Sequence, residues 1–459
     1  MPNTPAAMLK TSRKCAAFKP TWTRSVRGDA YRQRAPRDAG GHEQQGRRYA
    51  VVLLRFGHLS SLASVIATLA IENYRSLRRL VLPLRRLNVV TGANGTGKSS
   101  LYRALRLLSD ASRNGAVAAL AREGGLPSAL WGGPEHLGRS TRAREHPVQG
   151  TVRTGPVSLR LGFAGNDFGY SIDFGLPVPT VGEGPSKTSA FNLDPEIKRE
   201  CVWTGPVFRP ATALADRGGP GVRVRVDDGG WRVVHDALRP YDSMLSEVAD
   251  PRQAPELMVL RERIRSWRFY DLVRTDAGAP ARAAQIGTRT PVLSHDGSDL
   301  AAALQTIREI GDAAALDKAI DRAFPGSELE IAVHSGRFEV MLRQHGLLRP
   351  LGSAELSDGT LRYLLWVAAL LTPRPPALLV LNEPETSLHP DLLPPLADLI
   401  VAAGAHSQVV TVTHSRPLTA ALQQRTTDLA TIELIKDFGQ THLLDQEPLD
   451  EPPWQWPKR

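Results

Sequence analysis

The sequence has few cysteines and no long apolar segment. Only two of its 459 residues are cysteines, Cys15 and Cys201, and they lie far apart. Two isolated cysteines make neither a disulfide framework nor a metal site, and they indicate a reducing compartment. Apolar runs such as Leu378–Leu381 have the length of a strand, and none of the apolar runs approaches the length of a membrane-spanning helix. Because a membrane-spanning helix needs about 20 apolar residues, we expect a cytoplasmic protein that does not enter a membrane.

The positive charge is concentrated at the beginning of the chain. Residues 1–50 contain eleven lysines and arginines against three acidic residues, so they hold +8 of the net charge of +10. The remaining residues are nearly balanced, and bulk charge does not indicate a nucleic-acid surface on the folded part. We expect residues 1–62 to form a disordered basic tail. It could be a nucleic-acid-binding arm, a transit peptide, or the product of a start codon assigned too early.

The remaining residues, 63–459, alternate between strand and helix patterns, which predicts an α/β fold. Buried strands are expected at Leu87–Thr91, Ala377–Leu381 and Val409–Thr413, and helices at Lys98–Leu108 and Thr360–Leu371. Between these two groups, residues from about 110 to 345 carry alternating strands and further helices, which predicts an α+β insertion. Its helices are expected at Pro255–Tyr270, Leu300–Ile310 and Ala315–Phe324, and a hairpin is expected across Ser335-Gly336. Trp267 is expected to belong to the core rather than to stack on bases. Heptads and internal repeats are absent from the sequence, so long coiled-coil arms are not expected.

A glycine-rich segment between the first buried strand and its helix matches the phosphate-binding P-loop. Residues 92–99 read GANGTGKS and fit G-x-x-x-x-G-K-[ST] at every fixed position. The glycines allow backbone N–H groups to surround phosphate oxygens, and the following helix points its positive end at the same place. Lys98 would reach the β- and γ-phosphates, and Ser99 would bind Mg²⁺. The ATP-binding residues predicted here are Gly92, Ala93, Asn94, Gly95, Thr96, Gly97, Lys98, Ser99 and Ser100.

Polar residues follow the buried strand at 377–381, as in a Walker B motif. Asn382 and Glu383 stand at its carboxyl end, where α/β sheets present catalytic groups. Glu383 would orient or deprotonate the attacking water, and Asn382 would contribute to the Mg²⁺ site. The alternative is an ordinary charged loop after a buried strand. We predict ATP and Mg²⁺ as the cofactors, and Lys98, Glu383 and His414 as the catalytic residues.

The segment Leu356–Thr360 (LSDGT) resembles the LSGGQ signature of ABC ATPases. In that family, this segment contacts the γ-phosphate of a nucleotide held by the opposite subunit. The resemblance assigns this role to Ser357, Asp358 and Gly359. Alternatively, Ser357 or Asp358 is simply the N-cap of the following helix. His414, after the strand at 409–413, matches the switch histidine of the same family.

The order of these motifs is that of the ABC superfamily. The segments at 71–76 (IENYRS), 354–360, 381–391 (LNEPETSLHPD) and 411–415 resemble RecF- and SMC-type heads. They are most similar to a bacterial group of RecF-like AAA/ABC ATPases. The resemblance covers about residues 65–459. It implies a P-loop NTPase of ABC type, a mixed sheet with helices on both faces, and hydrolysis of ATP.

The resemblance also implies a partner and a biological role. Members of such families form head-to-head homodimers around ATP. Arg75 either reaches phosphate, as the matching residue does in relatives, or is a surface arginine. The role would lie in DNA repair or genome maintenance, with DNA or a repair protein as partner. The alternatives are a slow nucleotide-gated switch and the ATPase component of an anti-phage or toxin defence system. A transporter ATPase is disfavoured, since Lys98 and Ser357 are 259 residues apart.

Several positions depart from the family pattern. Walker B usually ends in Asp-Glu, whereas Asn382 brings no charge to the Mg²⁺ site. Asp358 stands where glycine is usual, and a carboxylate near phosphate is unfavourable unless it points away or meets a cation. His389 replaces the usual aspartate of the D-loop. No Q-loop glutamine can be assigned, and Gln149 is a weak candidate.

Overall fold

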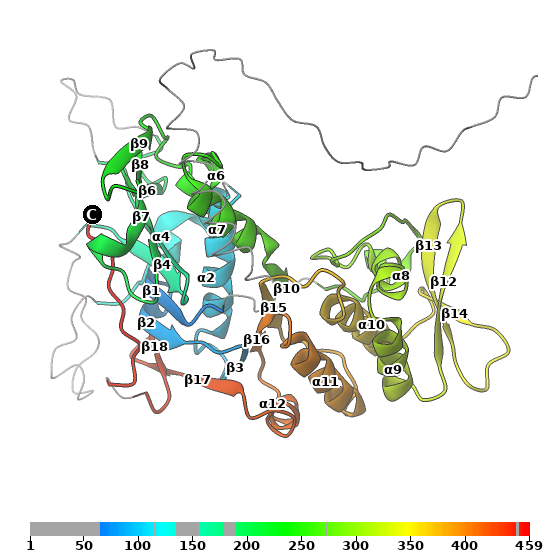
Figure 1. Ribbon diagram of the computed structural model, residues 1–459. Helices are drawn as coiled ribbons and strands as arrows, with labels where there is room; N and C mark the ends of the chain where they lie inside the picture. The colour runs from blue at the N-terminus through cyan, green and yellow to red at the C-terminus, as the bar shows by residue number, and fades with distance from the viewer. Residues whose placement is uncertain are drawn as a thin grey trace, which may run out of the picture. The chain divides into compact units, whose positions relative to one another are not determined.

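A six-stranded sheet forms the centre of the fold (Figure 1). The computed structural model describes residues 65–113, 115–134, 156–178, 190–248, 250–271, 273–446 and 449–459. These residues all belong to one unit, Arg47–Arg459. In spatial order, the strands are β10 (Arg268–Tyr270), β15 (Leu378–Asn382), β16 (Gln408–Val412), β3 (Leu87–Gly92), β17 (Leu429–Asp437) and β18 (Gln440–Leu443). All neighbours are parallel except β17 and β18, so the sheet is mixed.

Helices cover both faces of this sheet, as the sequence predicts. Side chains of a strand alternate between its two faces, and the two hydrophobic cores divide the strands accordingly. Val90 and Val380 belong to the core that contains α2 (Lys98–Ala111). Val89 and Leu381 belong to a second core on the other face, to which five helices contribute. The five helices are α8 (Leu300–Ile310), α9 (Ala313–Ala323), α10 (Asp358–Leu370), α11 (Leu393–Ala403) and α12 (Arg416–Gln423).

An antiparallel sheet of eight strands packs on the same core as α2. Its spatial order is β2 (Leu77–Pro83), β1 (Thr68–Tyr74), β4 (Leu159–Ala164), β5 (Phe168–Gly175), β6 (Glu196–Thr204), β7 (Ala213–Gly218), β8 (Gly221–Arg225) and β9 (Trp231–His235). Strands β4–β9 lie between the P-loop and the signature in sequence. An antiparallel sheet is therefore inserted into the nucleotide-binding fold, in agreement with the predicted α+β insertion.

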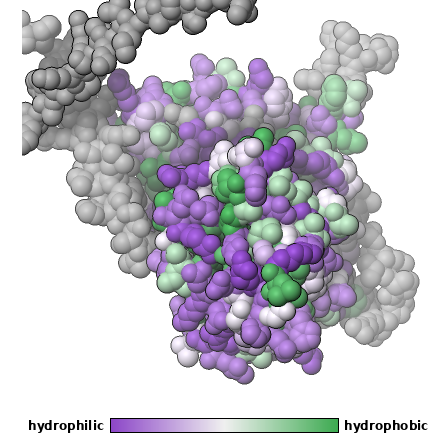
Figure 2. All heavy atoms as spheres, turned by 90° about the vertical axis from the view of Figure 1, so that its right-hand side faces the viewer, coloured by the Kyte–Doolittle hydropathy of each residue, from purple (hydrophilic) through white to green (hydrophobic). Residues whose placement is uncertain are grey.

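A third, small sheet precedes the signature in sequence. It contains β11 (Gln285–Ile286), β12 (Glu328–His334), β13 (Arg337–Arg343) and β14 (Leu351–Gly352). Strands β12 and β13 form the hairpin expected from Ser335-Gly336. The face on this side of the molecule is mainly hydrophilic, with small hydrophobic areas between polar ones (Figure 2). Scattered apolar side chains of this kind are normal on a protein surface.

The remaining helices are short or connect the sheets. They are α3 (Ala116–Arg122), α4 (Gly125–Ala129), α6 (Met244–Glu247) and α7 (Pro255–Ser266), with the 3₁₀ turns η2 (Pro210–Thr212), η3 (Pro280–Arg282) and η4 (Pro390–Leu392).

The helix predicted for Pro255–Tyr270 is wrong at its end. Helix α7 ends at Ser266, and Arg268–Tyr270 form strand β10 beside β15. Trp267, at the junction, is extended rather than helical and is buried. A strand of three residues is too short to produce an alternating pattern of its own, so the helical pattern before it extends across it.

Among the described residues, no helix is long and apolar enough to cross a membrane. The predicted tail, residues 1–62, and Gln149 lie outside the described residues. The boundaries of tail, domain and insertion remain predictions.

Candidate nucleotide-binding site

The P-loop turns between β3 and α2 as the motif requires. Gly92, Gly95 and Gly97 have φ values of 142°, 79° and 105°, which side chains disfavour. A Cβ on Gly97 would lie 2.5 Å from Thr441 Oγ1 and 3.0 Å from Ser76 Oγ. Space and backbone conformation both demand glycine there, and β18 closes the outer side of the loop.

Lys98 points back over the loop that precedes it. Its Nζ donates to the carbonyl oxygens of Gly92 at 2.6 Å and Ala93 at 3.0 Å. The side chain is buried, with 7% of the residue exposed. The ammonium group therefore lies inside the loop that would surround phosphates. Ser99, in the first turn of α2, is exposed at the same end of the helix.

The strand order brings the other predicted residues to the P-loop. Since β15, β16 and β3 are parallel neighbours, their carboxyl ends meet at one edge of the sheet. Glu383 follows β15, and its backbone N donates to Val412 O at 2.8 Å. His414 Nδ1 lies 3.6 Å from Glu383 Oε1. The histidine also lines a pocket of about 680 Å³ together with Gly92, Ala93 and Asn94.

Glu383 adopts a backbone conformation that is uncommon for a side chain of its kind. Its φ is +48°, and such positions are strained by about 1–3 kcal/mol. Strain of this kind is concentrated at functional sites. Its side chain remains 43% exposed, next to that of His414 at 55%.

Glu385 is a site residue that the motifs do not reveal. Its Oε1 accepts from Thr413 Oγ1 at 2.5 Å and from the His414 backbone N at 3.3 Å. Its side chain is only 10% exposed. Within the described structure, Glu385 Oε2 has no hydrogen-bond partner. The residue connects the loop after β15 to the loop after β16, and it adds a buried carboxylate two residues beyond Glu383.

The signature segment caps helix α10 and contacts the loop after β15. Ser357 is the N-cap of α10, and its Oγ accepts from Thr360 N at 3.1 Å. A Cβ on Gly359 would lie 2.8 Å from Ser387 O. About two turns further along α10, Trp366 Nε1 donates to Pro384 O at 2.9 Å. The capping role considered for Ser357 is therefore present, and α10 is attached to the segment that carries Glu383, the predicted catalytic glutamate.

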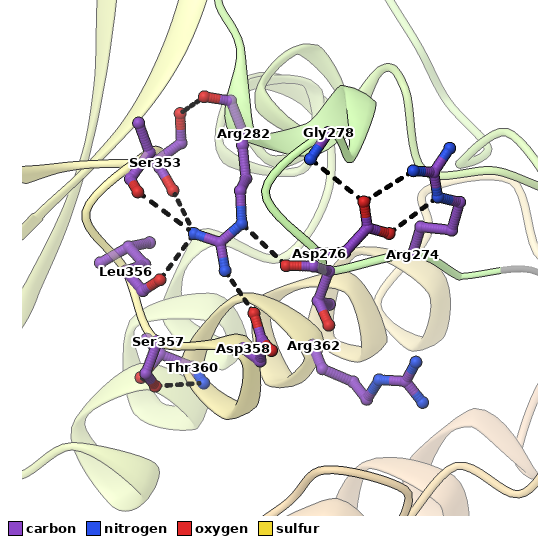
Figure 3. A network of polar contacts seen from close by, with 12 residues as sticks. Arg274, Asp276, Gly278, Arg282, Ser353, Leu356, Ser357, Asp358, Thr360 and Arg362 are labelled. Carbon is purple, nitrogen blue, oxygen red and sulfur yellow. Dashed lines mark hydrogen bonds and ion pairs between the residues drawn. The ribbon is translucent and has the colours of Figure 1, made fainter.

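Asp358 meets a cation from the insertion (Figure 3). Arg282, in η3, places Nη2 2.5 Å from Asp358 Oδ1. Its Nη1 donates to Leu356 O at 2.7 Å, and its Nε donates to Thr275 O at 2.7 Å. The arginine thus holds the signature segment and the chain after β10 together.

Arg362 lies one turn after Asp358 in α10, and it too connects this helix to the chain after β10. Its Nη2 donates to Val273 O at 2.7 Å. Within the described part of the chain, its buried Nε has no hydrogen-bond partner. Burial lowers the pKa of Arg362, and the nearby Asp358 carboxylate acts against this shift.

Other predicted residues occupy different surroundings. Arg75 pairs with Glu123, at 2.8 Å from Nη2 to Oε2. Tyr74 Oη donates to the same carboxylate. Burial, followed by the bond to Glu123, raises the pKa of Tyr74. The role of Arg75 in phosphate binding remains a prediction. His389 lies on the surface beside Asp391.

Strand β10 neighbours the Walker B strand β15 on the side away from β16, and a charged residue follows its end. Asp271 directly follows β10, and its Oδ2 lies 2.9 Å from Arg106 Nη1 of α2. A strand of three residues gives no signal that would identify Asp271 from sequence.

The basic stretch of α7 is largely occupied by contacts within the chain. Arg263 pairs with Asp167 at 2.6 Å, and Arg265 donates to Ser112 O. Arg268 donates to backbone carbonyls of its own segment. Nearby Trp267 is buried, which confirms that it belongs to the core.

The P-loop, the strand order and the neighbouring loops after β15 and β16 define the class: a mixed α/β P-loop NTPase. A family model described as "AAA domain, putative AbiEii toxin, Type IV TA system" matches residues 87–421. The chain belongs to this family. The resemblance to AAA/ABC-type ATPases is thus confirmed at this level, and the closer relation to RecF remains a prediction. No curated protein sequence matches the chain.

Solved structures of SMC heads are similar to the chain at low identity. The SMC head domain from Thermotoga maritima is 14% identical, with 83% of this chain and 99% of that chain covered and a TM-score of 0.38. An SMC head bound to the C-winged helix domain of ScpA is 12% identical, with coverage of 83% and 97% and a TM-score of 0.43. An SMC head with an extended coiled coil, bound to the C-terminal domain of ScpA derived from Pyrococcus furiosus, is 12% identical, with coverage of 83% and 95% and a TM-score of 0.41.

Proposed function

We propose that this protein hydrolyses ATP at a site completed by a second copy of the chain. The observation that supports this most strongly is the meeting of Lys98, Glu383 and His414 at one edge of the central sheet. Lys98 and the backbone N–H groups of residues 92–99 bind the phosphates. Glu383 orients the attacking water and accepts its proton. His414, 3.6 Å from that carboxylate, contacts the γ-phosphate.

The donor set fits a magnesium ion held mainly by phosphates and water. Among the described residues, no group of three or more histidines, cysteines and acidic residues could hold a metal by itself. Mg²⁺ in nucleotide sites typically keeps several waters and takes few protein ligands. Ser99 and Asn382 would supply neutral oxygens, and the ion would neutralise charge on the phosphates. Glu385, whose Oε2 has no hydrogen-bond partner among the described residues, would accept a hydrogen bond from a metal-bound water and would offset the missing charge of Asn382.

The signature segment supports the dimer. Within the described residues, no hydrogen bond or ion pair joins Ser357–Thr360 to the P-loop of the same chain. The segment instead contacts Ser387 and Arg282. Its helix N-terminus, an anion-binding feature, is therefore available to a nucleotide on another copy. In a homodimer around ATP, the P-loop of one copy and the signature segment of the other contact the same nucleotide.

The biological setting has two candidates. One is action on DNA or on a DNA-repair partner. The other is the ATPase component of a toxin or defence system, which the description of the matched family favours.

Steady-state hydrolysis by the full chain tests the proposal. We expect Mg²⁺-dependent release of phosphate from ATP that falls to background in Lys98→Ala. Hydrolysis that rises with linear duplex DNA supports action on DNA, whereas DNA-independent hydrolysis supports a protein partner. Tight ATP binding without turnover would support a slow switch and contradict the enzymatic proposal.

A further inference from the structure

The guanidinium group of Arg282 is held in place by carbonyl groups from two segments. Nε donates to Thr275 O, and Nη1 donates to Leu356 O at 2.7 Å, with longer bonds of 3.3 Å to Ser353 O and Ala354 O. The Ser353 hydroxyl donates back to Arg282 O at 2.8 Å. These bonds aim Nη2 at the Asp358 carboxylate (Figure 3). The arginine side chain is 10% exposed, whereas the aspartate is 58% exposed.

Asp358 is the first residue of α10, directly after Ser357. A carboxylate in the first turn of a helix is stabilised by the helix dipole. The same carboxylate repels any other anion that approaches this helix end. A signature segment with an uncompensated aspartate would therefore bind the phosphates of a second copy's nucleotide poorly.

We propose that Arg282 is a positioning residue of the signature segment. By pairing with Asp358, it neutralises this carboxylate and holds it against residues 273–282. Ser357 Oγ and the N-terminus of α10 then remain for the γ-phosphate of the nucleotide on a second copy. This inference rests on the proposed ATP-bound dimer, and it makes the insertion a contributor to the site.

The chemistry requires arginine rather than another cation. Nε and Nη1 both donate to carbonyl groups, which leaves Nη2 for Asp358 in a fixed direction. Lysine has a single flexible ammonium group and cannot satisfy both segments and the carboxylate with this geometry. We therefore expect Arg282→Lys to retain only part of the effect.

The experiment measures the ATP concentration at which Glu383→Gln, the variant expected to retain ATP, becomes dimeric. Arg282→Gln should raise this concentration at least about tenfold, a difference of about 1.4 kcal/mol. Asp358→Asn is the reference background for Arg282, because a neutral amide neither needs Arg282 nor repels phosphate. The double variant Arg282→Gln, Asp358→Asn should dimerise within about threefold of the ATP concentration that Asp358→Asn alone requires.

Two controls separate this role from a general loss of structure. Arg274→Gln removes a neighbouring ion pair, Arg274–Asp276, which is more than half exposed and lies in the same segment; it should leave dimerisation unchanged. Binding of a fluorescent ATP analogue to the P-loop at protein concentrations that keep the chain monomeric should be the same in all variants. If Arg282→Gln does not fold, Arg282→Lys with and without Asp358→Asn makes the same comparison.

If the double variant needs as much ATP to dimerise as Arg282→Gln does, the inference is overturned, since Arg282 would then act only through the carbonyl groups. Unimpaired dimerisation of Arg282→Gln would also overturn it, and would leave the proposed dimer intact. Absence of ATP-dependent dimers in the Glu383→Gln parent would instead contradict the proposed function and the inference with it.

Discussion

Gly359 permits helix α10 to approach the loop after the Walker B strand. Alanine in a helix is normally more stable than glycine by about 0.5–1 kcal/mol. Here the added Cβ would lie 2.8 Å from Ser387 O, a backbone atom that cannot move away alone. We expect Gly359→Ala to destabilise the fold by about 1–3 kcal/mol, measured by denaturant unfolding. Gly221, with open space around its Cβ position, is the matched control. A Gly359→Ala protein as stable as the wild type would contradict this packing.

Cys201 is buried in β6 and should be chemically inert in the native protein. Burial raises the pKa of its thiol, and the Asp216 carboxylate raises it further. Because only the thiolate reacts rapidly, a Cys15→Ser variant should resist a maleimide at pH 8 and react fully in guanidinium chloride. Mass spectrometry measures the labelling. Stoichiometric labelling before unfolding would show that β6 is not buried as described.

Residues of the site differ in how far sequence predicts them. The P-loop is a contiguous motif whose conformation is set by its own glycines, so Gly92, Gly97 and Lys98 lie as the sequence predicts. Glu385 and Arg282 gain their roles only from partners 28 and 76 residues away in the chain. A surface arginine and a second glutamate carry no local signal of such pairing.

At the scale of elements, Ser357 combines two roles that mutation can separate. As the N-cap of α10, it accepts from Thr360 N, and Ser357→Ala should lose about 1 kcal/mol of stability. Aspartate is an equally good N-cap, so Ser357→Asp should melt like the wild type. Its added charge should nevertheless abolish ATP-dependent dimers, as measured by light scattering. Normal dimerisation of Ser357→Asp would leave Ser357 with the capping role alone.

Elements with strong local patterns are predicted well, and short or edge elements are not. Helix α8 is found at the predicted residues Leu300–Ile310, because its apolar face repeats along its whole length. Strand β10 is missed because its three residues, Arg268–Tyr270, closely follow an amphipathic helix and continue that helix's pattern. This strand is relevant to the predicted site, because it places Asp271 beside the Walker B strand.

At the scale of the whole molecule, the insertion contacts both the nucleotide-binding fold and the signature segment. The eight-stranded sheet shares a core with α2, while the segment after β10 reaches the signature through Arg282. The alternation of strands predicts that an insertion exists. It does not predict which strands pair, because pairings between distant strands depend on tertiary packing rather than on local pattern.

The central claim is that two chains share the nucleotide. Its most direct test is the mass of full-length Glu383→Gln in solution with Mg²⁺ and ATP, measured by light scattering. Our account predicts twice the monomer mass with ATP and the monomer mass with ADP or after the further change Lys98→Ala. A monomer at every ATP concentration, with ATP shown to be bound, would contradict it.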